Sequence, residues 1–244
     1  MTFRVGLVRY AELVHGWVLD LPGCIAGAPT LESLDEPLRL AIAEYVGWLR
    51  SHGEPAPEGV DWEIAEDLDG ESFGATGGEF CFDDDRRPLT GGERESTLRL
   101  LEHSRAELVA ATEHLAPDVL DWAPPREAFA HFDAWAPEVR TIRDVARHVL
   151  ELEVYYRAGL RDGPAAGIFE PVGTPCDEHA KTVDLLRAMS DADLSRSYWP
   201  IRPGRSEAEE WTVRKAIRRL ISHERVHTAE IWQRRSWVLL GTPR

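Results

Sequence analysis

The sequence predicts an α+β protein in two units, a small α+β unit followed by a four-helix bundle. Short runs rich in β-branched and aromatic residues occupy residues 1–65, whereas long apolar stripes at helical spacing occupy residues 93–235. The net charge of the chain also differs between these two regions. Residues 1–92 carry 6 arginines and 18 acidic residues, a net of −12, out of −15 for all 244 residues. We therefore expect units over 1–65 and 93–244, joined by a linker over 66–92.

The first unit has alternating strand and helix signals. Residues 3–8 and 15–21 are bounded by turn formers and predict a β-hairpin. Helical spacing follows Thr30 and stops near Gly53, and residues 62–64 favour a further strand. The linker is rich in Gly, Asp and Glu, with one short strand expected at 79–82.

Three short motifs in this unit suggest a family. They are the Leu21-Pro22-Gly23-Cys24 turn, the Thr30-Leu31-Glu32 helix start and the Gly-Glu-Pro-Ala-Pro exit at 53–57. Together they resemble the HicB-like fold of bacterial antitoxin relatives over residues 4–65. The resemblance implies binding of a protein partner, typically a small toxin. The alternative is a unit that only packs on the rest of the chain.

The second unit predicts four helices. Apolar stripes at spacings of three and four run over about 93–115, 141–162, 178–189 and 207–235. Thr141 and Asp144 resemble a capping box at the start of the second stripe. Helices of this length joined by long connections favour a four-helix bundle.

Three histidines stand on the apolar stripes. His223 and His227 lie one helical turn apart on the last stripe, and His148 lies on the second. An imidazole in an apolar core needs partners for both nitrogens, and a shared metal ion would supply one of them. Three imidazoles also leave a coordination position open for water or substrate. The alternative is hydrogen-bonded histidines without a metal.

The surroundings of these histidines resemble the DinB-like family. The run from Thr141 to His148 and the start Trp211-Thr212-Val213-Arg214 before the HxxxH pair carry the resemblance, with Trp135 displaced. It implies an up-down-down-up bundle with His148, His223 and His227 as metal ligands. It also implies thiol-dependent transferase or isomerase chemistry in some members. The family often has Gln where this chain has Glu230.

The other polar residues near the stripes give weaker signals. Glu151 and Glu230 each follow a predicted ligand by three residues and could accept a hydrogen bond from it or act as a base. The alternative for both is a solvated face or an ion pair. His103 and His114 are expected at the surface. His131 and His179 are expected to line the cavity. No catalytic side chain is identifiable.

Charge and composition narrow the function. A net charge of −15 disfavours nucleic acids and anionic membranes, and Cys24, Cys81 and Cys176 are too scattered for a disulfide framework or a cysteine zinc site. Without a transmembrane run or signal peptide, we expect a cytoplasmic protein.

Two hypotheses follow. The first is a metal-dependent hydrolase or thiol-dependent transferase acting on a small molecule. Its cofactor would be a divalent metal ion, zinc or nickel ahead of iron or manganese. The second is a non-enzymatic binding protein with a structural or vestigial metal site and a HicB-like module. Its protein partner would be basic or neutral and bind in a salt-sensitive way, or a second copy would form a homodimer.

Overall fold

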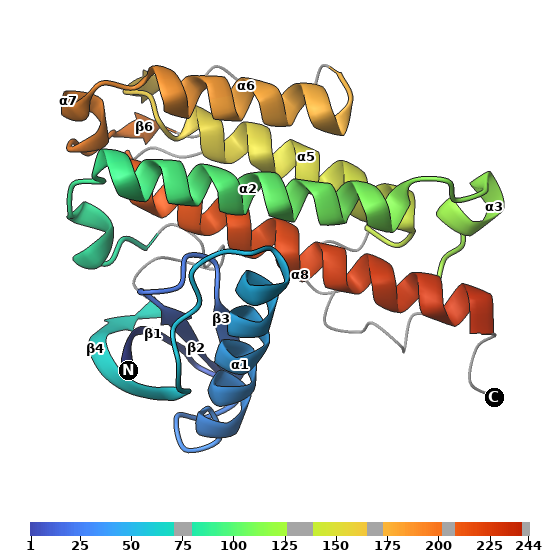
Figure 1. The fold of residues 1–244 in the computed structure, drawn as a ribbon, viewed down its shortest axis with the longest axis horizontal. Coiled ribbons are helices and arrows are strands. Elements are labelled where there is room, and N and C mark those ends of the chain that lie inside the picture. Colours follow the sequence, from blue (N-terminus) through green and yellow to red (C-terminus); the bar gives the residue numbers. More distant parts are fainter. Residues whose placement is uncertain (71–79, 126–138, 165–172, 202–207, 241–244) are drawn as a thin grey trace.

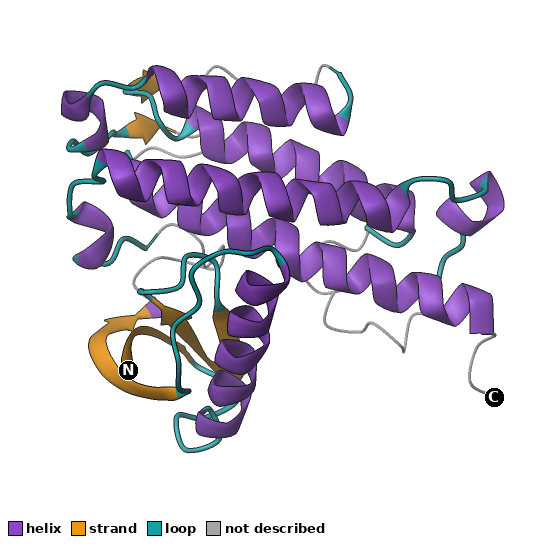
Figure 2. Cartoon of the chain, in the orientation of Figure 1, coloured by secondary structure: helices purple, strands orange, loops and turns teal. Residues whose placement is uncertain are grey.

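A computed structural model describes residues 1–70, 80–125, 139–164, 173–201 and 208–240. The predicted α+β class is confirmed: a small sheet with one long helix precedes a group of long helices (Figures 1 and 2). Among the described helices, none combines the length and the low charge that crossing a bilayer requires.

The N-terminal sheet has four strands in the order β3-β2-β1-β4. The strands are β1 (Thr2–Tyr10), β2 (Leu13–Val18), β3 (Ile25–Ala28) and β4 (Asp61–Asp69). The predicted hairpin is present as the antiparallel β1–β2 pair, but β2 ends at Val18 because the chain turns back there into β3. β4 joins β1 in parallel, so the chain must cross the sheet between β3 and β4.

The crossover is α1 (Asp35–Ser51). Thr30 and Ser33 bond to each other one turn before the helix, so they order its approach but do not cap it. Leu38, Ile42 and Leu49 on α1 are buried in one core with the strand residues that point to that face of the sheet. This amphipathic packing is what the helical spacing predicts.

The opposite face of the sheet is covered by the segment after β4. Phe80 and Phe82 are fully buried against Val8 and Trp17. Gly6 permits this contact, since a Cβ there would lie 2.5 Å from the Phe82 ring. β4 itself continues past residue 65 to Asp69, so the described parts of the expected linker are packed structure. Of the strand expected at 79–82, Glu79 lies outside the described residues and 80–82 are not a strand.

Four long helices form the second unit: α2 (Gly91–Thr112), α5 (Ile142–Ala158), α6 (Pro175–Ala188) and α8 (Val213–Leu240). The short elements are η2 (Asp84–Arg86), α3 (Pro117–Leu120), α7 (Asp191–Leu194) and the pair β5 (Gly163–Pro164) and β6 (Pro200–Ile201). α8 packs against both α2 and α5, and α6 packs against the same two helices. In Figure 1, α2 and α8 run in one direction while α5 and α6 run in the other, which is the up-down-down-up arrangement.

Side-chain caps define the helix starts. Thr141 and Asp144 form the expected capping box of α5, and the same box starts α2 and α6. α8 begins at Val213 and not at the expected Glu207, which lies outside the described residues. The reason is that Trp211 is held in extended pairing with Tyr198 by backbone bonds of 2.7 and 2.9 Å, so the chain enters the helix only afterwards.

The two units share one continuous hydrophobic core. The turn at Pro22-Gly23 lies directly on α8, and the Tyr45 hydroxyl donates to the Pro22 carbonyl at 2.5 Å. The guanidinium of Arg225 on α8 lies 4.1 Å from the centre of the Trp48 ring on α1. This contact is a cation–π interaction across the junction. The N-terminal unit therefore packs on the bundle, and its binding of a protein partner stays a prediction.

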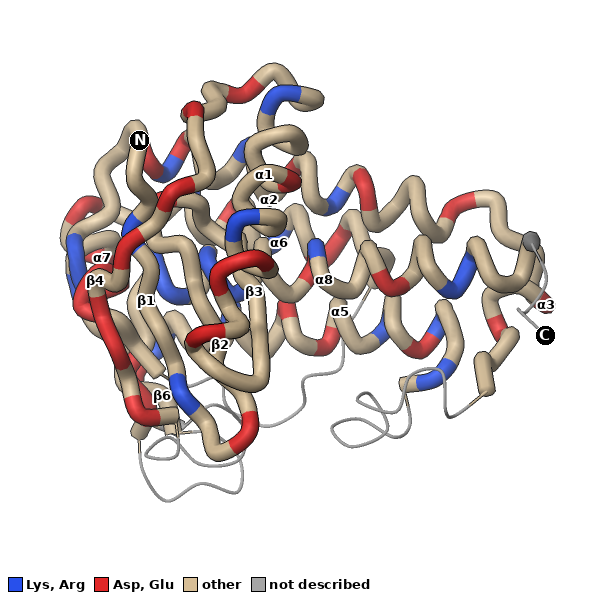
Figure 3. Tube along the Cα trace, turned by 90° about the horizontal axis from the view of Figure 1, so that it is seen from below, with Lys and Arg blue, Asp and Glu red and all other residues tan. Residues whose placement is uncertain are grey.

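The uneven charge is visible along the chain trace. Figure 3 shows acidic residues gathered along β4, where Asp61, Glu63, Asp67 and Asp69 are exposed. Two of them are paired with arginines, Asp61 with Arg39 at 2.7 Å and Asp67 with Arg9 at 2.6 Å.

Replacing Gly23 by alanine should destabilise the protein by about 2–4 kcal/mol. Its φ is +90°, and a Cβ would lie 2.5 Å from Ile221 on α8, so backbone strain and overpacking add. Gly47→Ala on the exposed side of α1 is the matched control. A Cβ there meets nothing within 4 Å, so about 0.5–1 kcal/mol of stabilisation is expected. Chemical denaturation of both variants measures the difference; equal effects would contradict the packing described for Gly23.

Candidate metal centre

Three imidazoles converge between α5 and α8. His148 Nε2 lies 3.2 Å from His223 Nε2, which in turn lies 3.1 Å from His227 Nε2. All three ligand atoms lie within 4.8 Å of one another. The helical turn between His223 and His227 sets half of this geometry, and the packing of α5 on α8 brings His148 to the pair.

The arrangement fits a metal ion. Metal–nitrogen bonds of about 2.0–2.1 Å place neighbouring ligand nitrogens about 2.9–3.4 Å apart in octahedral or tetrahedral geometry. The two short distances, 3.2 and 3.1 Å, fall in this range. Three nitrogens this close cannot all satisfy one another by hydrogen bonds, because each neutral imidazole has a single N–H to donate.

Glu230 holds one of the three rings. Its Oε2 accepts a hydrogen bond from His227 Nδ1 at 2.7 Å, and the Arg234 guanidinium lies 3.7 Å from the same oxygen. With the proton on Nδ1, the lone pair of His227 is on Nε2 and faces the other two rings. Glu151, the other carboxylate expected to act in this way, forms an ion pair with Arg147 at 3.6 Å on the outside of α5.

The environment favours a neutral imidazole at His223. Burial lowers the pKa of His223 well below its usual value, and the charged forms of His227 and His148 lower it further. The Tyr156 ring packs edge-on against His223, and the Tyr156 hydroxyl accepts a hydrogen bond from Arg219 at 3.2 Å. A small cavity of about 10 Å³ touches His223, which is room for about one water molecule.

A second polar cluster lines the same cavity. The sequence predicted only one of its members there, His179. It takes one side chain from each long helix: Arg105 of α2, Glu153 of α5, His179 of α6 and Glu224 of α8. Arg105 Nη2 donates to Glu153 at 2.6 Å, and Arg105 Nε lies 2.7 Å from Glu224 Oε1. His179 Nδ1 lies 3.7 Å from Glu153. The available signal was a charged residue, Arg105, at a core position of an otherwise apolar stripe.

Arg105 lies against two buried carboxylates, and their pKa values shift in opposite directions. Burial raises the pKa of Glu224 to about 7. Burial also acts upward on Glu153, but the nearby imidazole of His179 and the charge of Arg105 outweigh it, so the pKa of Glu153 is lowered. Glu153 is therefore the ionised partner of Arg105 at neutral pH.

The remaining histidines divide as follows. His114 is exposed, as expected. His103 is not at the open surface: it is half-buried at the junction of the units, 3.2 Å from Glu54 and stacked on His52. His131 and Trp135 lie outside the described residues.

The two carboxylates on Arg105 should respond differently to amide substitution. Glu153→Gln breaks a buried ion pair and should cost about 3–5 kcal/mol. Glu224→Gln should cost less, and its cost should shrink between pH 5 and pH 8. The folded pKa of Glu224 is raised, so its ionisation lowers stability as pH rises through this range, and the amide removes that loss. Denaturation of both variants at the two pH values measures this; equal, pH-independent costs would contradict the assignment.

Comparison with known proteins places the helical unit in a family. The chain resembles YfiT from Bacillus subtilis, a solved structure described as a probable metal-dependent hydrolase with an unusual four-helix bundle topology. The sequences are 18% identical, the match covers 64% of this chain and 91% of that one, and the TM-score is 0.43. No curated protein matches. The sequence model of the DinB superfamily matches residues 100–231, which is more than half of the chain. The HicB-like resemblance of residues 4–65 stays a prediction. The chain therefore belongs to the DinB superfamily.

Proposed function

We propose that His148, His223 and His227 hold a divalent metal ion through their Nε2 atoms, and that the protein uses it for hydrolysis or thiol transfer on a small molecule. One observation carries the proposal: the three Nε2 atoms lie within 4.8 Å of one another at separations that a single ion can span.

The chain prepares these three donors. Glu230 fixes the proton of His227 on Nδ1, and burial keeps His223 neutral. Imidazole donors suit zinc, nickel and iron, whereas manganese prefers oxygen donors. A metal bound by three imidazoles retains an open position, at which it supplies Lewis acidity to a water or a thiol.

The alternative is a closed metal site in a non-enzymatic binding protein. The volume of the cavity at His223, about 10 Å³ as lined by described residues, favours it because this cavity has room for only about one water molecule. In this case the metal stabilises the α5–α8 contact, and the acidic N-terminal unit binds a basic or neutral partner.

Metal content tests the site. The wild-type protein should bind one equivalent of zinc or nickel, and His223→Ala/His227→Ala should bind none. Glu230→Gln should weaken binding about 10–100-fold, because the ring of His227 loses its charged acceptor. Glu151→Gln is the matched control, since Glu151 also follows a ligand by three residues but faces Arg147. Titration calorimetry with elemental analysis measures both; equal losses in the two glutamine variants would contradict the role of Glu230.

Metal affinity should fall as the pH is lowered. Protons compete with the metal for imidazole nitrogens, so affinity drops below about pH 6.5 by up to tenfold per pH unit for each ligand that must lose a proton. His223 adds little competition at that pH, because its lowered pKa keeps it neutral in more acidic solution. Binding isotherms between pH 5 and 8 measure the slope. An affinity that does not change over this range would argue against histidine ligands.

Activity assays separate the two functions. The metal-loaded protein is assayed with an activated ester, and with a small thiol plus an electrophilic aromatic chloride. Metal-dependent turnover that is absent from His223→Ala/His227→Ala supports the enzyme. A rise in melting temperature on metal binding, without turnover of either probe, supports the closed structural site.

A further inference from the structure

A large cleft lies at the junction of the two units, and none of the three metal-centre histidines lines it. Its volume is about 550 Å³, within the range of about 300–1,000 Å³ typical of small-molecule sites. One wall comes from the N-terminal unit and from α1, and the other from the first turns of α2 and α8. Its apolar lining includes Leu21, Tyr45, Leu49, Pro55 and Leu100.

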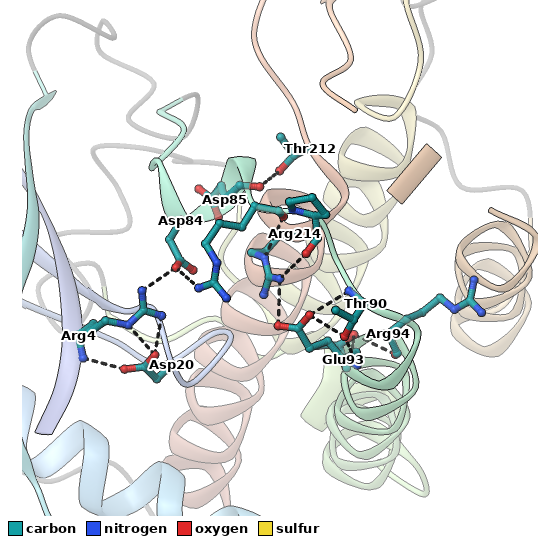
Figure 4. Close-up of polar contacts among 12 residues, drawn as sticks. Arg4, Asp20, Asp84, Asp85, Thr90, Glu93, Arg94, Thr212 and Arg214 are labelled. Carbon is teal, nitrogen blue, oxygen red and sulfur yellow. Dashed lines mark hydrogen bonds and ion pairs between the residues drawn. The ribbon is translucent and has the colours of Figure 1, made fainter. Parts of the chain in front are cut away.

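Arginines hold the carboxylates in this cleft. Asp20 accepts hydrogen bonds from Arg4 at 3.0 and 2.6 Å. Asp84 Oδ1 accepts from both Arg4, at 2.8 Å, and Arg87, at 2.6 Å. Figure 4 shows Arg4 between its two carboxylates.

The carboxylates on the bundle side of the cleft are also held by donors of the protein. Glu93 accepts from Arg214 at 3.0 Å and from the Thr90 hydroxyl at 2.8 Å, as Figure 4 shows. Glu54 accepts from Arg99 at 2.8 and 3.0 Å. An ionised carboxylate can accept hydrogen bonds but cannot donate them. The carboxylates of this cleft already accept hydrogen bonds from donors of the protein itself.

The guanidinium groups, in contrast, keep donors in reserve. Each has five N–H bonds. Of the nitrogens of Arg87, only Nη1 bonds to a described side chain, and this side chain is 54% exposed. Arg218 is a second arginine with an unused donor, and it is buried. It is 4% exposed, and its Nη1 has no hydrogen-bond partner among the described residues.

Arg218 does not line the cleft itself but lies beside it. It lines a narrow cavity of about 20 Å³ that shares five lining residues with the cleft: Leu19, Pro22, Asp84, Thr97 and Arg214. A buried donor without a partner costs about 1–3 kcal/mol, so an acceptor that enters from the cleft would relieve that cost.

The first turn of α2 adds to this preference. Gly92 lines the cleft, and a Cβ at this position would meet nothing within 4 Å. Thr90 already caps the N–H of Glu93 in this turn, whereas the N–H groups of Gly91 and Gly92 have no acceptor within the helix and carry partial positive charge.

From these features we propose that the cleft binds a small organic acid, in which a carboxylate or sulfonate takes the spare arginine donors and an apolar body lies on Tyr45, Leu49 and Leu100. Both charge signs are present in the walls, but each carboxylate is paired with an arginine, whereas Arg87 keeps donors that bond to no described side chain. The class of ligand is therefore anionic at one end and apolar at the other. This site is independent of the metal centre.

A matched pair of fluorescent probes tests the proposal on the full chain. The anion 8-anilinonaphthalene-1-sulfonate should bind with one-to-one stoichiometry, and the neutral N-phenyl-1-naphthylamine at least about tenfold more weakly. Arg87→Gln should weaken binding of the anion about tenfold, because a charge-assisted donor is lost. Gly92→Phe should abolish it by filling the cleft.

Two variants serve as controls. Arg143→Gln removes an arginine that is also 54% exposed and also paired with one aspartate, at the far end of the bundle. Gly91→Phe adds the same ring at the neighbouring glycine, which also has open space but does not line the cleft. Both should bind the anion like the wild type. Equal affinity for the neutral probe, no saturable binding, or full affinity in Arg87→Gln overturns the proposal. If Gly92→Phe is poorly folded, the exposed Arg87→Gln decides alone.

Discussion

A buried ion pair fixes α8 against η2, next to the segment that covers the N-terminal sheet. The Nε and Nη2 atoms of Arg218 donate to the two oxygens of Asp85 at 3.0 and 2.6 Å, and both side chains are almost fully buried. Asp85 also accepts the Phe82 N–H at 3.0 Å, while the guanidinium lies 4.6 Å from the centre of the Trp17 ring. Burying either charge alone would cost several kcal/mol, so the pair tolerates little displacement of one unit relative to the other.

The same helix carries the metal pair. Arg218 and His223 are five residues apart, which separates them by about 140° around an α-helix. One face of α8 therefore meets the sheet while another faces α5 and His148. Because both contacts belong to one rigid helix, the position of Arg218 also sets where His223 and His227 stand in the bundle. The packing of Gly23 on Ile221 reinforces this setting from the turn after β2.

Sequence periodicity predicted the features that depend on local geometry. The HxxxH pair, the α5 cap at Thr141 and the inward face of α1 follow from spacing along one helix. Features made by residues distant in sequence escaped it. Phe80 and Phe82 read as part of an acidic linker, although they close one face of the sheet. Their burial depends on Gly6 and Trp17, about 65–75 residues away in the sequence, which no periodic pattern records.

The polar cluster beside the metal centre bears on why a cation fits there. Arg105 is the charged donor to Glu153 and the ion-pair partner of Glu224, so one guanidinium stands against two buried carboxylates. Glu224 directly precedes Arg225 on α8 and follows His223, with which it lines one cavity. A bundle core rarely holds excess carboxylate without a compensating charge. A divalent ion held by the three imidazoles, as proposed, would add positive charge beside this cluster and so favour the ionised form of Glu224, whose pKa burial raises to about 7.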